Sequence, residues 1–207
     1  ALADAGMEQV DGLFAGNMMS GSANHQQHLG AYLADWVGLR HADSTHIEAA
    51  CGSAAAAFRN ALMAVASGTL ESAVALGVEK MTDSPSAEIT SELATAADAE
   101  WESSQGLSFV AINALIMRRY MHEYGWKHGD FAGFSINAHA NAAKNPHARF
   151  REPISEKAYT RSPLVADPIN LLDASPMGDG AAAAVLVPLE RLAAHQPRKV
   201  VVVAGSA

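Results

Sequence analysis

The stretch "STHIEAACGSAAAAFRNALMAVASG", from Ser44 to Gly68, decides the fold. Its β-branched beginning, over 44–49, predicts a strand. Apolar residues then recur at every third or fourth position as far as Val65, which predicts a helix that ends at Gly68. Cys51, the only cysteine of the chain, lies at the junction between the two.

Two interpretations of Cys51 follow from this junction. The first turn of a helix offers unpaired N–H groups and the positive end of the helix dipole, which favour a thiolate, the nucleophilic form of cysteine. The amides of Gly52, Ser53 and Ala54 would then be open to a ligand and to a developing oxyanion. Alternatively, Cys51 is a small apolar residue that fills space at a crowded turn. The local pattern leaves both interpretations open.

The remaining periodicities predict an α/β domain with a largely parallel sheet and an insertion. Strands are expected at 10–16 and 72–81, with a helix at 28–37 between them. Sheet-like sequence returns at 179–188 and 199–207. The stretch from about 82 to 172, between the two groups of strands, is the expected insertion. It holds five prolines, most of the aromatic and charged residues, and a helix over 107–125 that ends in cationic residues and a glycine.

Composition excludes several classes of protein. The 207 residues carry a formal net charge of −8 without a Lys/Arg run, which argues against binding to nucleic acid or to an anionic membrane. No apolar run approaches the roughly 18 residues that a membrane span needs. A single cysteine cannot form an internal disulfide, which fits a reducing compartment, and we expect a cytoplasmic protein. Neither end resembles a natural terminus, so we expect a segment of a longer polypeptide.

Several phrases resemble the thiolase superfamily. "ACGSAAAAFRNALMAVASG" is similar to its nucleophile segment, and "GVEKM" at 77–81 resembles the turn that ends the family's next strand. "VDGLFAGNM" and "LLDASPMGDGAAAAVL" match two further strands and turns. "RRYMHEYG", "NAHANAAKNPHARFREPIS" and "SPLVADPINLLD" resemble the insertion of the archaeal and sterol-carrier-protein-type branch. The resemblance covers nearly the whole chain.

The resemblance implies acyl transfer on coenzyme A thioesters. Cys51 would attack an acyl-CoA to give an acyl-cysteine, which a second, α-deprotonated acyl-CoA would then attack in a Claisen condensation. The reverse direction is thiolysis of a 3-ketoacyl-CoA. The expected activity is that of an acetyl-CoA C-acetyltransferase, with acyl-CoA as substrate and with no metal and no separate cofactor. A homodimer or homotetramer is implied, with the loop after "AGNM" and the strand before Cys51 at the interface.

The resemblance also implies that the catalytic set is incomplete. Thiolases use further histidines, in an Asn/His-Glu/Asp-Ala/Cys-Phe motif and in a Gly-His-Pro motif, and none of the nine histidines here has those flanks. The chain would comprise the first part of the N-terminal sheet domain (1–81), the inserted loop domain (82–172), and the final strands of the sheet domain with the start of a connection (173–207). A C-terminal domain with the acid–base groups would be absent, and the chain alone would not turn over.

Other residues are weaker candidates. His139 lies in a part of the insertion that resembles the family's substrate-facing side, so it is a candidate for contact with coenzyme A, although local hydrogen bonding is the simpler interpretation. His25 and His28 are three residues apart, but two ligands without a third make a poor metal site. Asp173 and Asp179 flank a turn and are interpreted as capping residues.

Two alternative functions stay open at this stage. One is a condensing enzyme of the ketosynthase type, which also places a cysteine at a helix start. The other is a non-catalytic or aldolase-type thiolase-like subunit of a larger complex, for example with a hydroxymethylglutaryl-CoA synthase and a zinc-binding scaffold protein. The long insertion with its Asn-Pro and Asp-Pro pairs argues against the first, and Cys51 within "AACGSA" favours acyl transfer over the second.

Overall fold

We describe a computed structural model of the chain, which covers residues 1–195, 197 and 199–206. The chain forms two compact units. The first combines residues 1–84 with 179–207, and the second comprises residues 85–178. The second unit is therefore an insertion between two parts of the first, and each unit is described by itself below.

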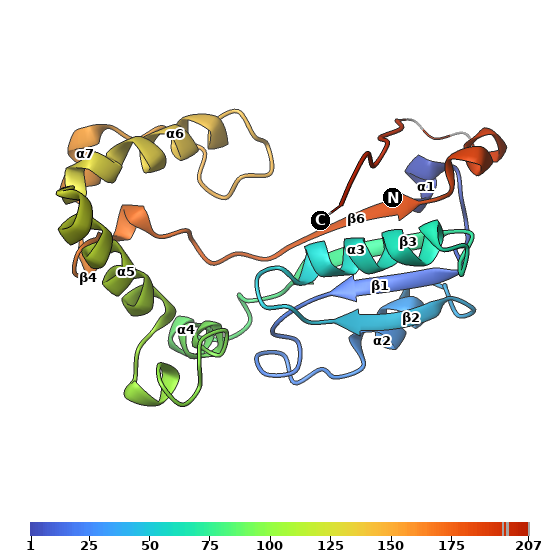
Figure 1. Cartoon of the computed structure of the whole chain (residues 1–207), viewed down its shortest axis with the longest axis horizontal. Helices are drawn as coiled ribbons and strands as arrows, with labels where there is room; N and C mark the ends of the chain where they lie inside the picture. The colour runs from blue at the N-terminus through green and yellow to red at the C-terminus, as the bar shows by residue number, and fades with distance from the viewer. Residues whose placement is uncertain (196, 198, 207) are drawn as a thin grey trace. The chain divides into compact units, whose positions relative to one another are not determined.

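A four-stranded sheet forms the centre of the first unit (Figure 1). Its order is β2 (Asp43–Ile47), β1 (Gly12–Gly16), β3 (Ala73–Glu79) and β6 (Gly180–Leu186). The first three strands run parallel, and β6 pairs antiparallel with β3. The predicted α/β class with a largely parallel sheet is thereby confirmed, with one antiparallel strand at its edge.

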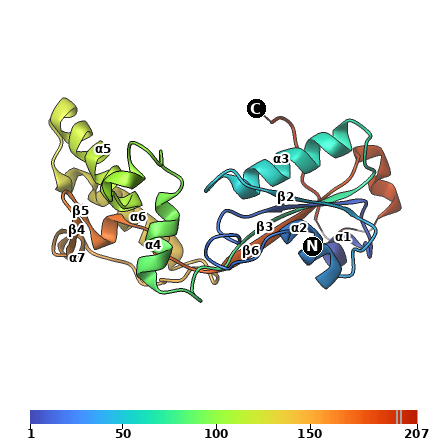
Figure 2. The same cartoon turned by 90° about the horizontal axis from the view of Figure 1, so that it is seen from below.

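Helices cover the two faces of this sheet. α3 (Ser53–Ala66) lies on one face, and α2 (Leu29–Trp36) with the short α1 (Leu2–Ala5) on the other (Figure 2). The alternation along β3 explains the two cores, because Ala73 and Ala75 pack toward α3 while Val74 packs on the side of α2. The two layers bury mostly alanine, valine and leucine side chains, so the helices lie close to the sheet.

Two glycines of the sheet allow α3 to begin directly on top of it. A Cβ at Gly16 would lie 2.4 Å from the carbonyl oxygen of Ser53 and 2.7 Å from the Cα of Ala54. A Cβ at Gly77, the register partner of Gly16 on β3, would lie 2.5 Å from the Cβ of Ala54. The first turn of α3 is therefore in backbone contact with the centre of the sheet.

The second unit is mainly helical. Its one long helix is α5 (Phe109–Tyr124), whose N-terminus is capped by the Ser108 side chain and whose C-terminus is followed by Gly125 at φ 70°. A two-stranded sheet pairs β4 (Leu164–Ala166) with β5 (Ile169–Asn170). The remaining elements are α4 (Ser86–Ala94), η1 (Ser103–Gln105), η2 (His128–Phe131), α6 (Ala132–Ala142), α7 (Glu156–Thr160) and η3 (Leu171–Asp173).

The core of the second unit includes a polar cluster. Tyr159 on α7 is fully buried, and its ring stacks on that of His128 with 4.8 Å between centroids. The phenol hydroxyl donates to the Asp173 carboxylate, whose other oxygen lies 2.7 Å from His128 Nε2. Asp173 also accepts the Asn170 N–H at 2.8 Å. This cluster joins η2, α7 and η3.

One predicted strand is wrong. Residues 199–206 have no regular structure, although four consecutive valines favour an extended strand, and Ala207 lies outside the described residues. A strand needs a neighbour for its backbone hydrogen bonds, and within the described residues this segment pairs with none. Between β6 and this segment the chain forms the short η4 (Leu189–Ala194) instead. Within the described part of the chain, every helix is too short or too polar to cross a membrane.

Candidate functional site

Cys51 lies just beyond the carboxyl end of β2, on the turn that leads into α3. This is the end of a parallel sheet at which α/β proteins generally bind ligands. The Cys51 side chain is exposed and is a free thiol. The structure thus favours the presented thiol over the buried, space-filling residue.

The turn around Cys51 is held by short-range hydrogen bonds. The Gly52 N–H donates to the Ala49 carbonyl at 2.9 Å, and the Ser53 N–H donates to the Ala50 carbonyl at 3.1 Å. The expectation that both of these amides are open to a ligand is therefore wrong, because the tight turn uses them itself. The Ala54 N–H donates to no protein acceptor among the described residues, as expected for the first turn of a helix.

A second network orders the loop that follows β1 at the same end of the sheet. The buried Asn17 donates from Nδ2 to the Val78 carbonyl at 2.7 Å and to Glu79 Oε2 at 3.0 Å. The other oxygen of Glu79 accepts the Met18 N–H, and Asn17 Oδ1 accepts the Ser20 N–H at 2.6 Å. The sequence placed Glu79 in a turn that resembles a family motif but indicated no role for it, and Asn17 was not singled out, although each lies at the end of a strand.

Asp179 fastens the point where the chain re-enters the first unit. Its Oδ1 accepts the N–H groups of Met81 and Thr82 at 2.7 and 3.0 Å. Its Oδ2 accepts from the Thr82 hydroxyl at 2.5 Å and from Lys80 Nζ at 2.9 Å. The hydrogen bond from Thr82, followed by that from Lys80, holds the pKa of the carboxyl well below its usual range. The interpretation of Asp179 as a turn-capping residue agrees with these contacts.

Of the weaker candidates, His139 makes a local contact, and His25 and His28 lie in the segment between β1 and α2. His139, on α6 of the second unit, has Nδ1 3.2 Å from the Glu152 carbonyl, and its contact with coenzyme A stays a prediction. His25 and His28 both have positive φ, 54° and 59°. Among the residues that the structure covers, no three His, Cys, Asp or Glu side chains are grouped to hold a metal ion.

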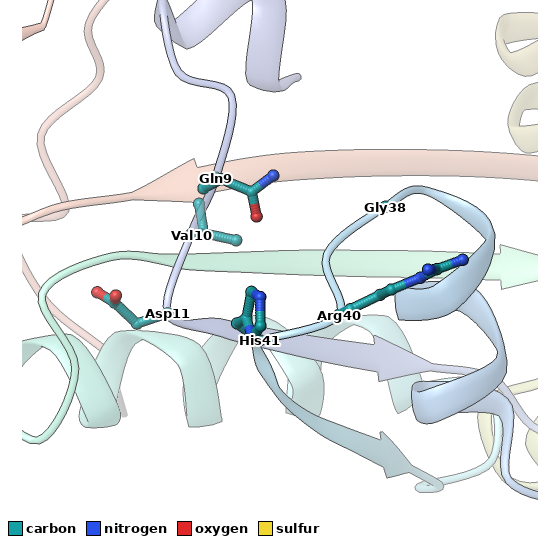
Figure 3. A pocket seen from close by; sticks show the side chains of 6 residues that line it. All are labelled: Gln9, Val10, Asp11, Gly38, Arg40 and His41. Carbon is teal, nitrogen blue, oxygen red and sulfur yellow. The ribbon is translucent and has the colours of Figure 1, made fainter.

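A solvent-open hollow of about 510 Å³ lies at the amino ends of β1 and β2, whereas Cys51 follows the carboxyl end of β2. Figure 3 shows the residues that line this hollow. Its lining comes from the segments that precede β1 and β2, including Asp11, Arg40 and His41. Asp11 is already bonded to the Ser72 hydroxyl at 2.9 Å, and Arg40 is paired with Asp35 at 2.9 Å. Its position at the amino ends of the strands separates it from the candidate site.

The sequence profile described as "Thiolase, N-terminal domain" matches residues 1–190. The chain belongs to the thiolase family. The Cys51 turn, the Glu79 turn and the Asp179 turn thus lie in a thiolase N-terminal domain, at the same end of its sheet.

One curated relative and two solved structures are similar to most of this chain. The acetyl-CoA acetyltransferase of Methanothermobacter thermautotrophicus is 43% identical over 192 residues, which are 92% of this chain and 50% of that protein. Among solved structures, the Ltp2-ChsH2(DUF35) aldolase is 29% identical with a TM-score of 0.67, over 95% of this chain and 50% of the other. The acetyl-CoA acetyltransferase of Syntrophomonas wolfei shares the fold with a TM-score of 0.69 at 17% identity, over 91% and 56%. The chain spans about half the length of the curated relatives it matches.

Proposed function

We propose that this chain supplies the nucleophile of a coenzyme-A-dependent acyltransferase, with Cys51 as that nucleophile. The observation that carries the proposal is the 43% identity, over 92% of the chain, to an acetyl-CoA acetyltransferase. The exposed thiol at the carboxyl end of β2 adds physical support, because a nucleophile must be reachable by its substrate.

The proposed reaction is acyl transfer in two stages. The Cys51 thiolate attacks the thioester carbonyl, the C–S bond to coenzyme A breaks, and an acyl-cysteine forms with release of the coenzyme A thiolate, which takes up a proton. A second acetyl-CoA, deprotonated at its α-carbon, then forms a C–C bond to the acyl carbon and releases Cys51, giving acetoacetyl-CoA. Thiolysis of a 3-ketoacyl-CoA is the reverse. Acyl-CoA is the substrate, and no separate cofactor takes part.

The groups that move protons in this reaction are proposed to lie outside these 207 residues. The histidine motifs on which thiolases rely are not found in the sequence. Acylation of Cys51 is therefore the half-reaction to which this chain contributes directly, and the condensation step needs the full-length protein. We propose that this protein acts in the cytoplasm as a homodimer or homotetramer, with the β2 edge of the sheet at the interface.

Mass spectrometry after incubation with acetyl-CoA tests the function. The full-length protein should gain one acetyl group on the peptide that contains Cys51, and hydroxylamine should remove it, as expected for a thioester. The Cys51→Ala variant is the matched control and should gain none. An unmodified Cys51 in a folded protein that is saturated with acetyl-CoA would contradict the proposal.

An aldolase-type activity is the second candidate, favoured by the 29% identity and the TM-score of 0.67 to the Ltp2-ChsH2(DUF35) aldolase. In that case the protein would cleave a C–C bond of a CoA thioester as a subunit of a complex, and the cysteine would not be required. The two candidates differ in one variant. Cys51→Ala abolishes acyl transfer but leaves aldol cleavage intact.

A further inference from the structure

Ser53 follows the proposed nucleophile by two residues and forms hydrogen bonds to both residues that precede Cys51. Its side chain is buried, and Oγ accepts the Ala49 N–H at 2.9 Å. The same hydroxyl donates to the Ala50 carbonyl at 2.6 Å, alongside the Ser53 N–H at 3.1 Å. One serine therefore makes three hydrogen bonds to the two residues before Cys51.

Ala50 needs this support because its backbone is left-handed, with φ 48°. Non-glycine residues adopt this region rarely, since the Cβ crowds the following carbonyl oxygen. Such a conformation persists only where its surroundings hold it. Here the Ala50 carbonyl is held by Ser53, and the Ala50 N–H donates to the Glu48 carboxylate. Both peptide planes that flank Ala50 are thus fixed.

The orientation of Cys51 follows from that of Ala50. The peptide that joins them is planar, so a fixed Ala50 carbonyl also fixes the direction of the Cys51 N–H and the position of its Cα. Ser53 can serve as a rigid reference because the first turn of α3 contacts the sheet at Gly16, with no room for a Cβ between them. Glu48, by contrast, is exposed at the surface.

We propose that Ser53 is a positioning residue for the acyl-transfer reaction. Its hydroxyl keeps Ala50 left-handed and thereby aims the Cys51 thiol and the adjoining amide at the thioester. This inference rests on the proposed function, in which Cys51 is the nucleophile. Ser53 does not touch the substrate itself, so it acts through the Ala50–Cys51 peptide.

The test compares Ser53→Ala with Ser67→Ala. Ser67, at the other end of α3, also bonds a local carbonyl, that of Ala64 at 3.1 Å, but far from Cys51 in the helix. Loss of the Ser53 hydroxyl should slow acetylation of Cys51 by acetyl-CoA about 10- to 100-fold, the scale expected for a misaligned reacting group. Alkylation by iodoacetamide, which needs only an exposed thiol, should change less than about twofold. Ser67→Ala should leave both rates unchanged.

Two further variants guard against a merely structural effect. Ser53→Thr retains the hydroxyl and should restore most of the acetylation rate. A glycine at position 50 adopts positive φ without penalty, so Ser53→Ala should lower the acetylation rate much less in the Ala50→Gly background than in the parent. This double variant also covers the case in which Ser53→Ala alone fails to fold. Equal losses in the parent and in the Ala50→Gly background would overturn the proposal, as would an unchanged acetylation rate in Ser53→Ala.

An NMR measurement separates failure of this inference from failure of the proposed function. A strong intraresidue contact between the amide proton and Hα of Ala50 reports positive φ, whether or not Cys51 reacts with acetyl-CoA. We expect it in the parent and in Ser67→Ala but not in Ser53→Ala. If the parent is never acetylated, the proposed function fails. If Ala50 stays left-handed without the hydroxyl, the positioning role fails.

Discussion

The first unit presents an exposed cysteine on a strained turn, whereas the second unit joins a buried tyrosine and two partly buried titratable side chains to one another. Cys51 is a free thiol on a turn that Ser53 and the sheet hold in place. In the second unit, Tyr159, His128 and Asp173 use their polar atoms on each other. A cluster of titratable residues is therefore not in itself a candidate site, because its polar atoms are already bonded to one another. The exposed, free thiol of Cys51 is the better candidate.

Replacement of Cys51 by alanine should separate function from stability most sharply. We expect loss of acyl transfer by at least about 1,000-fold, since removal of a nucleophile eliminates the covalent route. The free energy of unfolding should change by less than about 0.5 kcal/mol, because the side chain is exposed. Steady-state turnover of the full-length protein and urea unfolding measure the two. A large loss of stability with activity retained would show that Cys51 is a packing residue and not a nucleophile.

Gly16→Ala should damage the first unit more than any glycine substitution in the second. The added Cβ would lie 2.4 Å from the Ser53 carbonyl oxygen and 2.5 Å from its carbonyl carbon, so α3 must move, at a cost of about 3 kcal/mol. Gly133→Ala on α6 is the matched control, because a Cβ there meets nothing within 4 Å. In a helix it should stabilise by about 0.5–1 kcal/mol. Urea unfolding followed by circular dichroism compares both, and a neutral Gly16→Ala would contradict the tight contact.

Tyr159→Phe should destabilise the second unit by about 2 kcal/mol, because it leaves the partly buried Asp173 carboxylate without its hydroxyl donor. Tyr124→Phe is the control in the same unit, since that ring is exposed. Protease sensitivity within 85–178 and urea unfolding report the loss. If both variants behave alike, the cluster does not stabilise the unit.

The same tyrosine predicts a response to alkaline pH. Burial, with the hydrogen bond to Asp173 as a second cause, raises the pKa of the Tyr159 phenol. The folded state then keeps the proton when the unfolded chain begins to lose it, near pH 10. The contribution to stability is thus complete below about pH 10 and lost as the pH rises further. Tyr159→Phe should remove this part of the alkaline loss.

The sequence predicts the first unit better than the second. Strands at 10–16 and 72–81 correspond to β1 and β3, and the helix after Cys51 corresponds to α3, because alternation and helical spacing are strong signals there. In the second unit only α5 was predicted. The other elements are too short for a period to show, and the contact of His128 with Asp173 joins residues 45 apart.

The candidate site, too, could be predicted only in part from the sequence. Cys51 could be selected from its place between a strand and a helix. The left-handed Ala50 could not, because alanine carries no signal for positive φ and its conformation depends on hydrogen bonds from Glu48 and Ser53. The strand predicted at 199–207 is not formed over 199–206, because four valines favour an extended conformation but a strand also needs a neighbouring strand to pair with.

Asp179→Asn should change the free energy of unfolding least of these variants. Asp179 acts only on the turn where the chain passes back from the second unit into the first. The hydrogen bonds from Thr82 and Lys80 lower the pKa of this carboxyl, so the folded state binds its proton less readily than the unfolded chain does. The stabilising contribution is therefore present above about pH 4, the ordinary pKa of aspartate, and is lost as the pH falls below it. The urea midpoints of the parent and of Asp179→Asn should differ at pH 6 and converge toward pH 2. Asp83→Asn is the control, because it also contacts Lys80, at 2.7 Å, but accepts neither backbone N–H group. A constant difference between parent and variant across this range would mean that the turn depends on the shape of Asp179 and not on its charge.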